Sequence, residues 1–202
     1  SLAKADRIVA VTDESRNFLV KTHHILPSRI IVVPLGVDTG AFRFSNKART
    51  SIRKKFGIKK EDVVLVFSGT IVRRKGIEIL FSALSEIKNR NAKLLIVGSG
   101  DSSYMRELKD IIGRLKILDR VIFAGFVNKS KVMDYFSASD IGVWPGNNSV
   151  SIIEAMTCGL PIVMADMQLS HLVGYWNGIK FPQHDVEKLR ESLEMLINSR
   201  KI

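Results

Sequence analysis

The chain has 202 residues, of which 46% are hydrophobic, and 31 Lys and Arg against 20 Asp and Glu give a formal net charge of +11. No apolar run approaches the roughly 18 residues of a membrane-spanning helix, and no secretory signal peptide is recognisable. The single cysteine, Cys158, excludes an intrachain disulfide and is typical of a reducing compartment, so a cytoplasmic location is expected.

The basic excess predicts an anionic partner such as a nucleotide, an acidic lipid surface or nucleic acid. Part of the excess is concentrated between Arg43 and Lys60, where eight residues are basic and none is acidic. We interpret this run as a solvated helix face, with peripheral contact to an anionic membrane as the alternative. Nucleic acid is the least expected partner, because no recognised binding motif accompanies the run.

The first part of the chain predicts two short strands with a helix between them. These three elements are expected at Arg7–Val11, Asp13–Lys21 and Arg29–Val33. Pro34 and Gly36 then break the pattern, and a less ordered segment follows. The best domain boundary lies in that segment, so residues 1–42 are expected to be separate from a main domain of residues 43–202.

In the main domain, helices alternate with short apolar strands. Strands are expected at Val63–Phe67, Leu94–Val97, Val121–Ala124, Ile141–Trp144, Pro161–Ala165 and Ile179–Phe181. Helices are expected at 46–56, Lys75–Lys88, Tyr104–Leu115, Lys131–Ser137, Ile152–Met156, Leu169–Val173 and Asp185–Asn198. This alternation predicts an α/β fold with a doubly wound parallel sheet of the Rossmann type. Ligands of such sheets bind beyond the carboxyl ends of the strands, so a site is expected in the loops that follow them.

The loop after the first strand of the main domain combines a glycine turn with three consecutive cations. Cations at the start of a helix are unfavourable to its dipole, and their presence is best explained if they hold an anion such as a diphosphate. Lys75 would then act as a point charge, and Arg73 or Arg74 as a bidentate fork. A solvated basic turn is the alternative.

The next two loops carry weaker signals. Gly98 and Gly100 form a G-x-G without a third glycine, which indicates a tight turn or a close approach to a ligand. Residues 125–129 offer backbone amides and an apolar wall to a base. The sequence has no Ser-His-Asp set, no metal-ligand spacing and no P-loop, so no metal is expected.

The stretch 141–166 is predicted to be a strand, a turn, a short helix and a strand, and the chemistry is expected to converge on its turn. Ser149 or Ser151 is predicted to cap the helix, whose free N–H groups and dipole favour an anion. Glu154, about a turn and a half further on, is suited to accept hydrogen bonds from hydroxyls such as those of a ribose. The N–H groups expected to meet the anion are those of Asn148, Ser149 and Val150.

Five segments occur in a characteristic order: GTIVRRKG, LLIVGSGD, VIFAGFV, DIGVWPGNNSVSIIEAMTCGLPIVMAD and NGIKF. In this order they resemble the donor-binding, C-terminal half of retaining glycosyltransferases of the GT-B fold, the group of glycogen synthases, sucrose synthases and phosphatidylinositol mannosyltransferases. Upstream, ADRIVAVTDESRNFLVK and IIVVPLGVDTGAF resemble the end of that family's acceptor domain. The resemblance implies that this chain is the donor-binding part of a longer enzyme and is inactive alone.

The resemblance also implies roles for single residues. Lys75 matches the lysine that contacts the donor diphosphate, and Glu154 matches the second glutamate of the E-x7-E motif, which binds the ribose; these two are the expected catalytic residues. Val127 matches a position whose backbone contacts the base. The other expected donor-binding residues are Gly69, Thr70, Arg73, Arg74, Gly98, Phe126, Asn147, Asn148, Ser149 and Val150.

The family transfers a sugar from a UDP- or GDP-sugar to a glycan or lipid acceptor with retention, and it needs no metal or other cofactor. In its mechanism the leaving diphosphate helps to deprotonate the acceptor, and fixed positive groups stabilise that diphosphate.

Two positions depart from the family. Its first motif glutamate falls on Gly146, where Asn147 or Asn148 is expected to serve as a neutral substitute, and its diphosphate arginine falls on Thr70. These departures leave two alternatives to a transferase: a pseudoenzyme that only binds the nucleotide sugar, and a basic domain that contacts membranes or nucleic acid.

Overall fold

The structure is a computed structural model, and it describes residues 4–146, 149–167, 172–174 and 176–199. It divides into two compact units, residues 1–37 and 38–202. The boundary predicted from the sequence, after residue 42, lies in the same connecting segment. In the described ranges, no helix is both long and apolar enough to cross a bilayer.

The first unit is a small strand-helix-strand arrangement. Its elements are β1 (Ile8–Ala10), α1 (Asp13–His23), the 3-10 turn η2 (Pro27–Arg29) and β2 (Ile30–Val32). The two strands pair in parallel, and Thr12 caps α1 by accepting a 3.0 Å hydrogen bond from the Ser15 N–H. Four buried residues form its core: Ile8, Ala10, Ile25 and Ile30. The two strands and the helix predicted for this part are confirmed.

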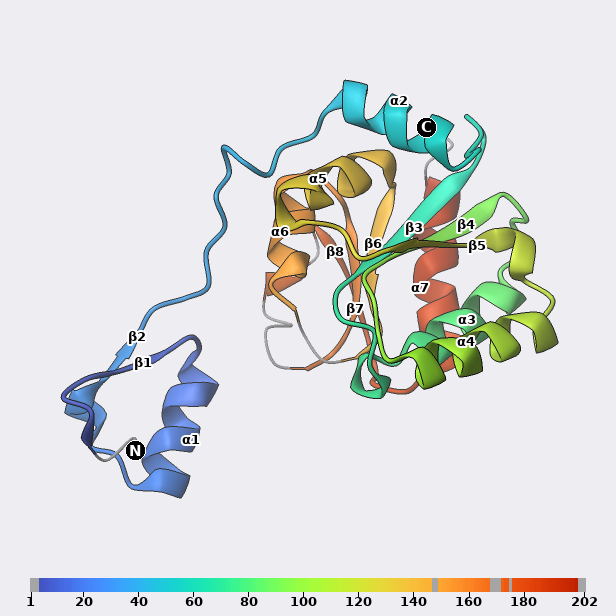
Figure 1. Cartoon of the computed structure of the whole chain (residues 1–202). Coiled ribbons are helices and arrows are strands. Elements are labelled where there is room, and N and C mark those ends of the chain that lie inside the picture. Colours follow the sequence, from blue (N-terminus) through green and yellow to red (C-terminus); the bar gives the residue numbers. More distant parts are fainter. Residues whose placement is uncertain (1–3, 147–148, 168–171, 175, 200–202) are drawn as a thin grey trace. The chain divides into compact units, whose positions relative to one another are not determined.

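The second unit contains a six-stranded sheet whose paired strands all run parallel (Figure 1). Its strands are β3 (Val63–Ser68), β4 (Ala92–Val97), β5 (Val121–Gly125), β6 (Ile141–Trp144), β7 (Ile162–Ala165) and β8 (Gly178–Phe181). Their spatial order is β5-β4-β3-β6-β7-β8, so the chain starts in the middle, builds one half and then crosses to build the other. This order confirms the predicted doubly wound sheet and places its switch point between β3 and β6.

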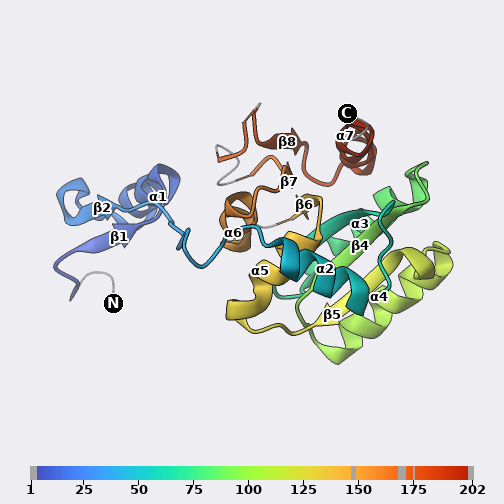
Figure 2. The same cartoon turned by 90° about the horizontal axis from the view of Figure 1, so that it is seen from above.

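Helices cover both faces of the sheet, as Figures 1 and 2 show. The α-helices of this unit are α2 (Asn46–Lys55), α3 (Ile77–Glu86), α4 (Ser102–Arg114), α5 (Lys129–Ala138), α6 (Ser151–Thr157) and α7 (Val186–Ser199). On one face α3 packs against α4 and α7, and on the other α5 packs against α2 and α6. The 3-10 turns are η3 (Arg73–Lys75) and η4 (Leu118–Arg120). The helix predicted at 169–173 lies largely outside the described residues.

The core forms between the sheet and these two helical layers. Every residue of β3 is buried, as are all residues of β6 and β7, because a parallel strand covered on both faces is apolar along its whole length. Trp144, at the end of β6, is fully buried, and its indole Nε1 donates a 3.1 Å hydrogen bond to the Ser68 carbonyl at the end of β3. The carboxyl ends of these two strands are therefore linked at the switch point.

The basic helix α2 holds itself against the sheet through two of its arginines. Arg49 Nη2 lies 2.8 Å from one carboxylate oxygen of Asp140, whose side chain is fully buried, and Arg53 donates to the carbonyls of Ala138 and Asp62 at 3.0 and 2.7 Å. Burial lowers the pKa of Arg53, and the attraction of Asp140 opposes that shift. For these two cations the interpretation as a solvated face is wrong, because each has acceptors beneath the helix. The exposed cations of the run are Arg43, Lys47, Lys54, Lys55, Lys59 and Lys60.

Candidate functional site

An open cleft of about 510 Å³ lies beyond the carboxyl ends of β3, β4 and β5, next to the start of α6. This is where ligands of doubly wound sheets bind. The loops after three different strands and the first turn of α6 contribute its walls. Eight of the residues predicted to bind the donor line it: Gly69, Thr70, Gly98, Phe126, Val127, Ser149, Val150 and Glu154.

Arg73, Arg74 and Lys75, the three cations predicted to lie at the start of a helix, do not lie at one. They form η3, and α3 begins two residues after it, at Ile77. The helix start predicted at Lys75 is wrong because Gly76 adopts a left-handed conformation, with φ of 64°, and separates the 3-10 turn from the α-helix. None of the three cations is among the residues that line the cleft. Asn147 and Asn148, also predicted to bind the donor, lie outside the described residues.

Arg73 directs its guanidinium fork at a carboxylate on α4. Its Nη1 lies 2.8 Å from Glu107 Oε1, its Nη2 bonds to the other carboxylate oxygen, and its guanidinium stacks over the Tyr104 ring at 4.8 Å. The hydrogen bond raises the pKa of Arg73 and lowers that of Glu107. Both side chains are largely exposed, so water screens the pair. In this arrangement the fork that was predicted to hold a diphosphate is bound to Glu107.

Lys75 lies inside the packing of its loop and is only 5% exposed. Burial lowers the pKa of Lys75, and the nearby charge of Arg74 lowers it further. A buried cation attracts an anion more strongly than a cation in water does, because the local dielectric constant is lower, provided that the anion reaches it. The diphosphate role implied for Lys75 by the resemblance stays a prediction.

Gly146, where the family has its first motif glutamate, lies against the backbone of η3. A Cβ atom at this position would be 2.5 Å from the Arg74 carbonyl oxygen and 2.5 Å from the Lys75 carbonyl carbon. Carbon atoms do not approach backbone this closely, so any side chain here would displace the turn that carries Lys75. The missing carboxylate therefore has a steric reason in this protein.

The G-x-G loop is also explained by the close approach of another loop. Gly98 has a φ of 144°, and a Cβ atom there would be 1.9 Å from the Gly69 carbonyl oxygen. Two residues later, Gly100 pairs with Ile71 in an isolated parallel bridge. Gly98 nevertheless lines the cleft, so the tight contact between loops brings its backbone to the ligand side.

The start of α6 is tied to the end of β3 by serine side chains. The predicted side-chain cap is wrong: the residue before the helix is Val150 in helical conformation, and no side chain caps it. Instead Ser151 Oγ donates a 2.7 Å hydrogen bond to the Ser68 carbonyl, and Ser149 Oγ lies 2.8 Å from Ser151 Oγ. Ser68 therefore receives hydrogen bonds from both Trp144 and Ser151.

Glu154 lies in the wall of the cleft with a side chain that is 8% exposed. Its Oε1 atom is 3.6 Å from the Nζ atom of Lys129, which is the first residue of α5 and is 78% exposed. Asn128 caps the same helix by accepting from the Ser130 N–H at 3.2 Å. A carboxylate that is nearly buried but still faces a cleft is suited to accept hydrogen bonds from the hydroxyl groups of a ligand.

Lys129 is the site residue that sequence reasoning missed. Among the described residues that line the cleft, it is the one cation, and Glu154 is the one anion. The signal for it was hidden, because the helix was predicted to begin at Lys131; in the structure α5 begins at Lys129, where a cation is unfavourable to the dipole. The same argument had pointed to Arg73, Arg74 and Lys75.

Within the described residues, no group of three His, Cys, Asp or Glu side chains is arranged to hold a metal ion. The expectation that the reaction needs no metal or other cofactor stays a prediction.

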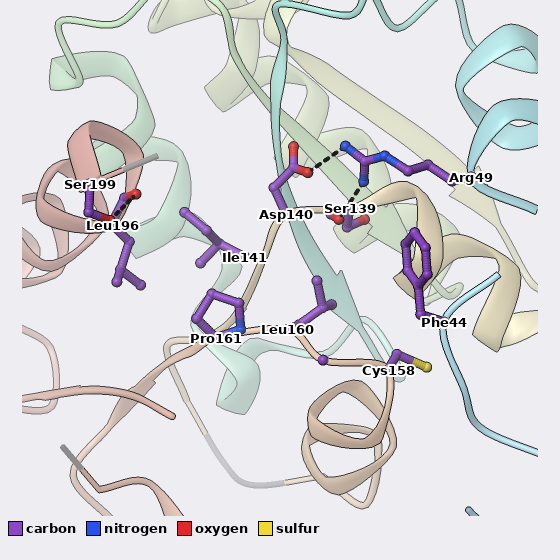
Figure 3. Close-up of a pocket in the computed structure, with 11 residues that line it drawn as sticks. Phe44, Arg49, Ser139, Asp140, Ile141, Cys158, Leu160, Pro161, Leu196 and Ser199 are labelled. Atoms are coloured by element: carbon purple, nitrogen blue, oxygen red, sulfur yellow. Dashed lines mark hydrogen bonds and ion pairs between the residues drawn. The ribbon is translucent and has the colours of Figure 1, made fainter. Parts of the chain in front are cut away.

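A second hollow, of about 420 Å³, lies at the opposite end of the sheet, where β6 and β7 begin (Figure 3). Its charged groups, Arg49 and Asp140, are paired with each other, and its apolar part includes Leu160 and Pro161. Cys158 also borders it; burial, followed by the charge of Glu154, raises the pKa of this thiol to about 11. This hollow contains a structural ion pair and a buried thiol, and it lies away from the ligand-binding end of the sheet.

Comparison with solved structures shows the same fold in glycosyltransferases. HepE of Anabaena in complex with UDP matches 98% of this chain and 55% of its own length with a TM-score of 0.88 and 22% identity. The C-terminal domain of a glycosyl transferase group 1 family protein, LpcC of Francisella tularensis, matches 82% of this chain and 90% of its own with a TM-score of 0.71 and 20% identity. These likenesses confirm the predicted fold class, a Rossmann-like domain of the GT-B kind.

Sequence comparison identifies the family. A D-inositol 3-phosphate glycosyltransferase of Xylanimonas cellulosilytica is 31% identical over 173 residues, which are 81% of this chain and 41% of that protein. The chain thus spans less than half the length of this relative. The family model described as glycosyl transferases group 1 matches residues 48–202, which include every residue that lines the cleft. This chain therefore belongs to the glycosyl transferases group 1 family.

Proposed function

We propose that this chain binds the nucleotide-sugar donor of a glycosyltransferase that transfers a sugar with retention of anomeric configuration. One observation carries the proposal: residues of four separate segments, each expected from the sequence to contact a donor, line a single cleft at the switch point of the sheet. Glu154 offers a carboxylate to the ribose hydroxyls, and Phe126 and Val127 offer an apolar wall to the base.

The structural neighbours support a nucleoside diphosphate sugar as the ligand. HepE was solved with UDP-glucose as well as with UDP, and the UDP-glucose complex matches 96% of this chain with a TM-score of 0.83. UDP is therefore the first nucleotide to test, and GDP, which the resemblance to the family also implies, is the second. The acceptor, a glycan or a lipid, would be bound largely by the part of the enzyme beyond this chain.

The test is binding of UDP and GDP to the chain and to two matched variants. Glu154→Gln keeps the shape of the side chain but removes its charge, and we expect it to weaken nucleotide binding about tenfold, because hydrogen bonds to a charged acceptor are the stronger ones. Glu61→Gln is the control, since Glu61 is exposed and does not line the cleft. Titration calorimetry that detects neither UDP nor GDP, or that gives both variants the affinity of the unaltered chain, would refute the proposal.

Gly146 favours a second candidate, a protein that binds the nucleotide sugar without transferring it. The packing at this position excludes a carboxylate, so any catalytic contribution of the family's first glutamate is missing. Incubating the intact protein with UDP-glucose or a GDP-sugar and candidate acceptors decides between the two. A glycosylated product with a retained anomeric centre by NMR supports transfer, and its absence with intact nucleotide binding supports the second candidate.

The exposed cations of residues 43–60 support peripheral contact with an anionic membrane. Vesicle sedimentation with and without phosphatidylserine tests this, and we expect Lys54→Ala/Lys55→Ala to reduce binding to the anionic vesicles. Equal binding of both proteins, or of both kinds of vesicle, would refute a role for this surface.

A further inference from the structure

The cleft contains two charged side chains among its described lining residues, and they are of opposite sign. Lys129 comes from the start of α5 and Glu154 from the body of α6. A nucleoside diphosphate also presents two kinds of polar group next to each other: ribose hydroxyls, which can donate hydrogen bonds, and phosphates, which are anionic. The carboxylate suits the first kind, and the ammonium suits the second.

In the structure these two side chains are paired with each other. The Lys129 Nζ and Glu154 Oε1 atoms are 3.6 Å apart, and the lysine side chain is 78% exposed while the glutamate side chain is 8% exposed. The ammonium thus approaches the carboxylate from the solvent side. An ion pair with one partner in water is weak, so a ligand can replace it at little cost.

Of the three cations of η3, one is paired, one is buried, and the third, Arg74, is exposed but does not line the cleft. Arg73 holds Glu107 on α4, and Lys75 is buried in its loop; neither lines the cleft. Among the described residues, the cation that lines the cleft is therefore Lys129.

We propose that Lys129 is a ligand-binding residue that exchanges partners when the nucleotide enters the cleft. The ribose hydroxyls take its place on Glu154, and the released ammonium pairs with the diphosphate. No covalent step is involved, and the total number of ion pairs is conserved. This inference rests on the proposed function, since it requires the cleft to bind a nucleoside diphosphate.

The exchange has a consequence that a structural role of Lys129 would not produce. Removing the ammonium deprives the diphosphate of a partner, but it also removes the group that competes with the ribose for Glu154. Binding of UDP and of the uncharged nucleoside uridine should therefore respond in different ways to the same substitution.

The test uses Lys129→Met, which keeps the aliphatic stem, and Lys131→Met as the matched control, an exposed lysine two residues further along α5 that does not line the cleft. Titrations of the whole chain with UDP and uridine are followed by 15N-1H correlation NMR, which measures weak affinities. We expect Lys129→Met to weaken UDP about fivefold to tenfold and to leave uridine unchanged or tighter. Lys131→Met should change either affinity less than about twofold, because water and salt screen the interaction between this exposed charge and a ligand in the cleft.

The outcomes separate this inference from the proposed function. Equal weakening of UDP and uridine by Lys129→Met would mean that Lys129 only positions Glu154, and equal UDP affinities of the two lysine variants would exclude any contact with the diphosphate; either result overturns the exchange. If the unaltered chain binds neither UDP nor GDP, the proposed function itself fails. Amide shifts confined to the cleft confirm that the variants fold normally.

Discussion

Substituting alanine for Gly146 is expected to destabilise the second unit by about 2–3 kcal/mol. The added methyl would stand 2.5 Å from the Arg74 carbonyl oxygen and 2.5 Å from the Lys75 carbonyl carbon, whereas ordinary contacts begin at 3.4 Å. The turn must therefore move by nearly 1 Å, against hydrogen bonds of 2.9 Å from Lys75 N to Val72 O and from Gly76 N to Arg73 O. Overpacking typically costs about 1–3 kcal/mol, and an obstacle made of backbone places this case at the upper end.

Tryptophan fluorescence during thermal unfolding measures this effect in the right part of the chain, because both tryptophans, Trp144 and Trp176, belong to the second unit. For a chain of this size we expect Tm to fall by about 4–12 °C. Gly113→Ala is the control: Gly113 lies in α4, an added Cβ there meets nothing within 4 Å, and alanine favours the helix, so Tm should rise slightly. If Gly146→Ala unfolds within 1 °C of the unaltered chain, the steric account of the missing carboxylate is refuted.

Three further predictions concern buried polar groups. Asp140→Ala removes the carboxylate that pairs with Arg49 and Arg53 and should cost about 3–5 kcal/mol in urea unfolding; a loss below about 1 kcal/mol would show that the pairs are dispensable. Arg120→Met should change stability by less than about 1 kcal/mol, because Arg120 Nη1 is buried without a hydrogen-bond partner and its desolvation offsets the bonds to Ala92 and Asn89; a loss above about 3 kcal/mol would contradict this. The Cys158 pKa of about 11 lies above the ordinary value, so the thiolate is scarce at pH 8 and iodoacetamide should react slowly in the folded chain and faster in urea; equal rates would contradict the burial of this thiol.

The sheet could be predicted from the sequence because its signal is local. Buried parallel strands are continuous apolar runs, and Val63–Phe67 or Leu94–Val97 needs no knowledge of the rest of the chain to be recognised. The site loops followed from the rule that ligands bind at the carboxyl ends of such strands, and most of the residues expected there do line the cleft.

The details that sequence reasoning missed depend on contacts between distant segments. The α6 start was assigned a serine cap, but the Ser68 carbonyl, 83 residues away, competes for the Ser151 hydroxyl. The ion pair of Arg73 was not foreseen, because Glu107 lies on another helix; the diphosphate role of Arg73 or Arg74 stays a prediction. The close packing of Gly146 was not foreseen, because only the folded chain brings the η3 backbone against it.

The serine contacts at the switch point decide what kind of group Ser149 can offer to the cleft. A hydroxyl has a single proton, and a carbonyl oxygen has none to give, so the Ser151 proton must lie on the Ser68 side. The 2.8 Å contact between the two hydroxyls is then made by the Ser149 proton. With its proton directed at Ser151, Ser149 Oγ presents lone pairs to the cleft, so it is better suited to accept a hydrogen bond from a sugar hydroxyl than to donate one to a phosphate oxygen.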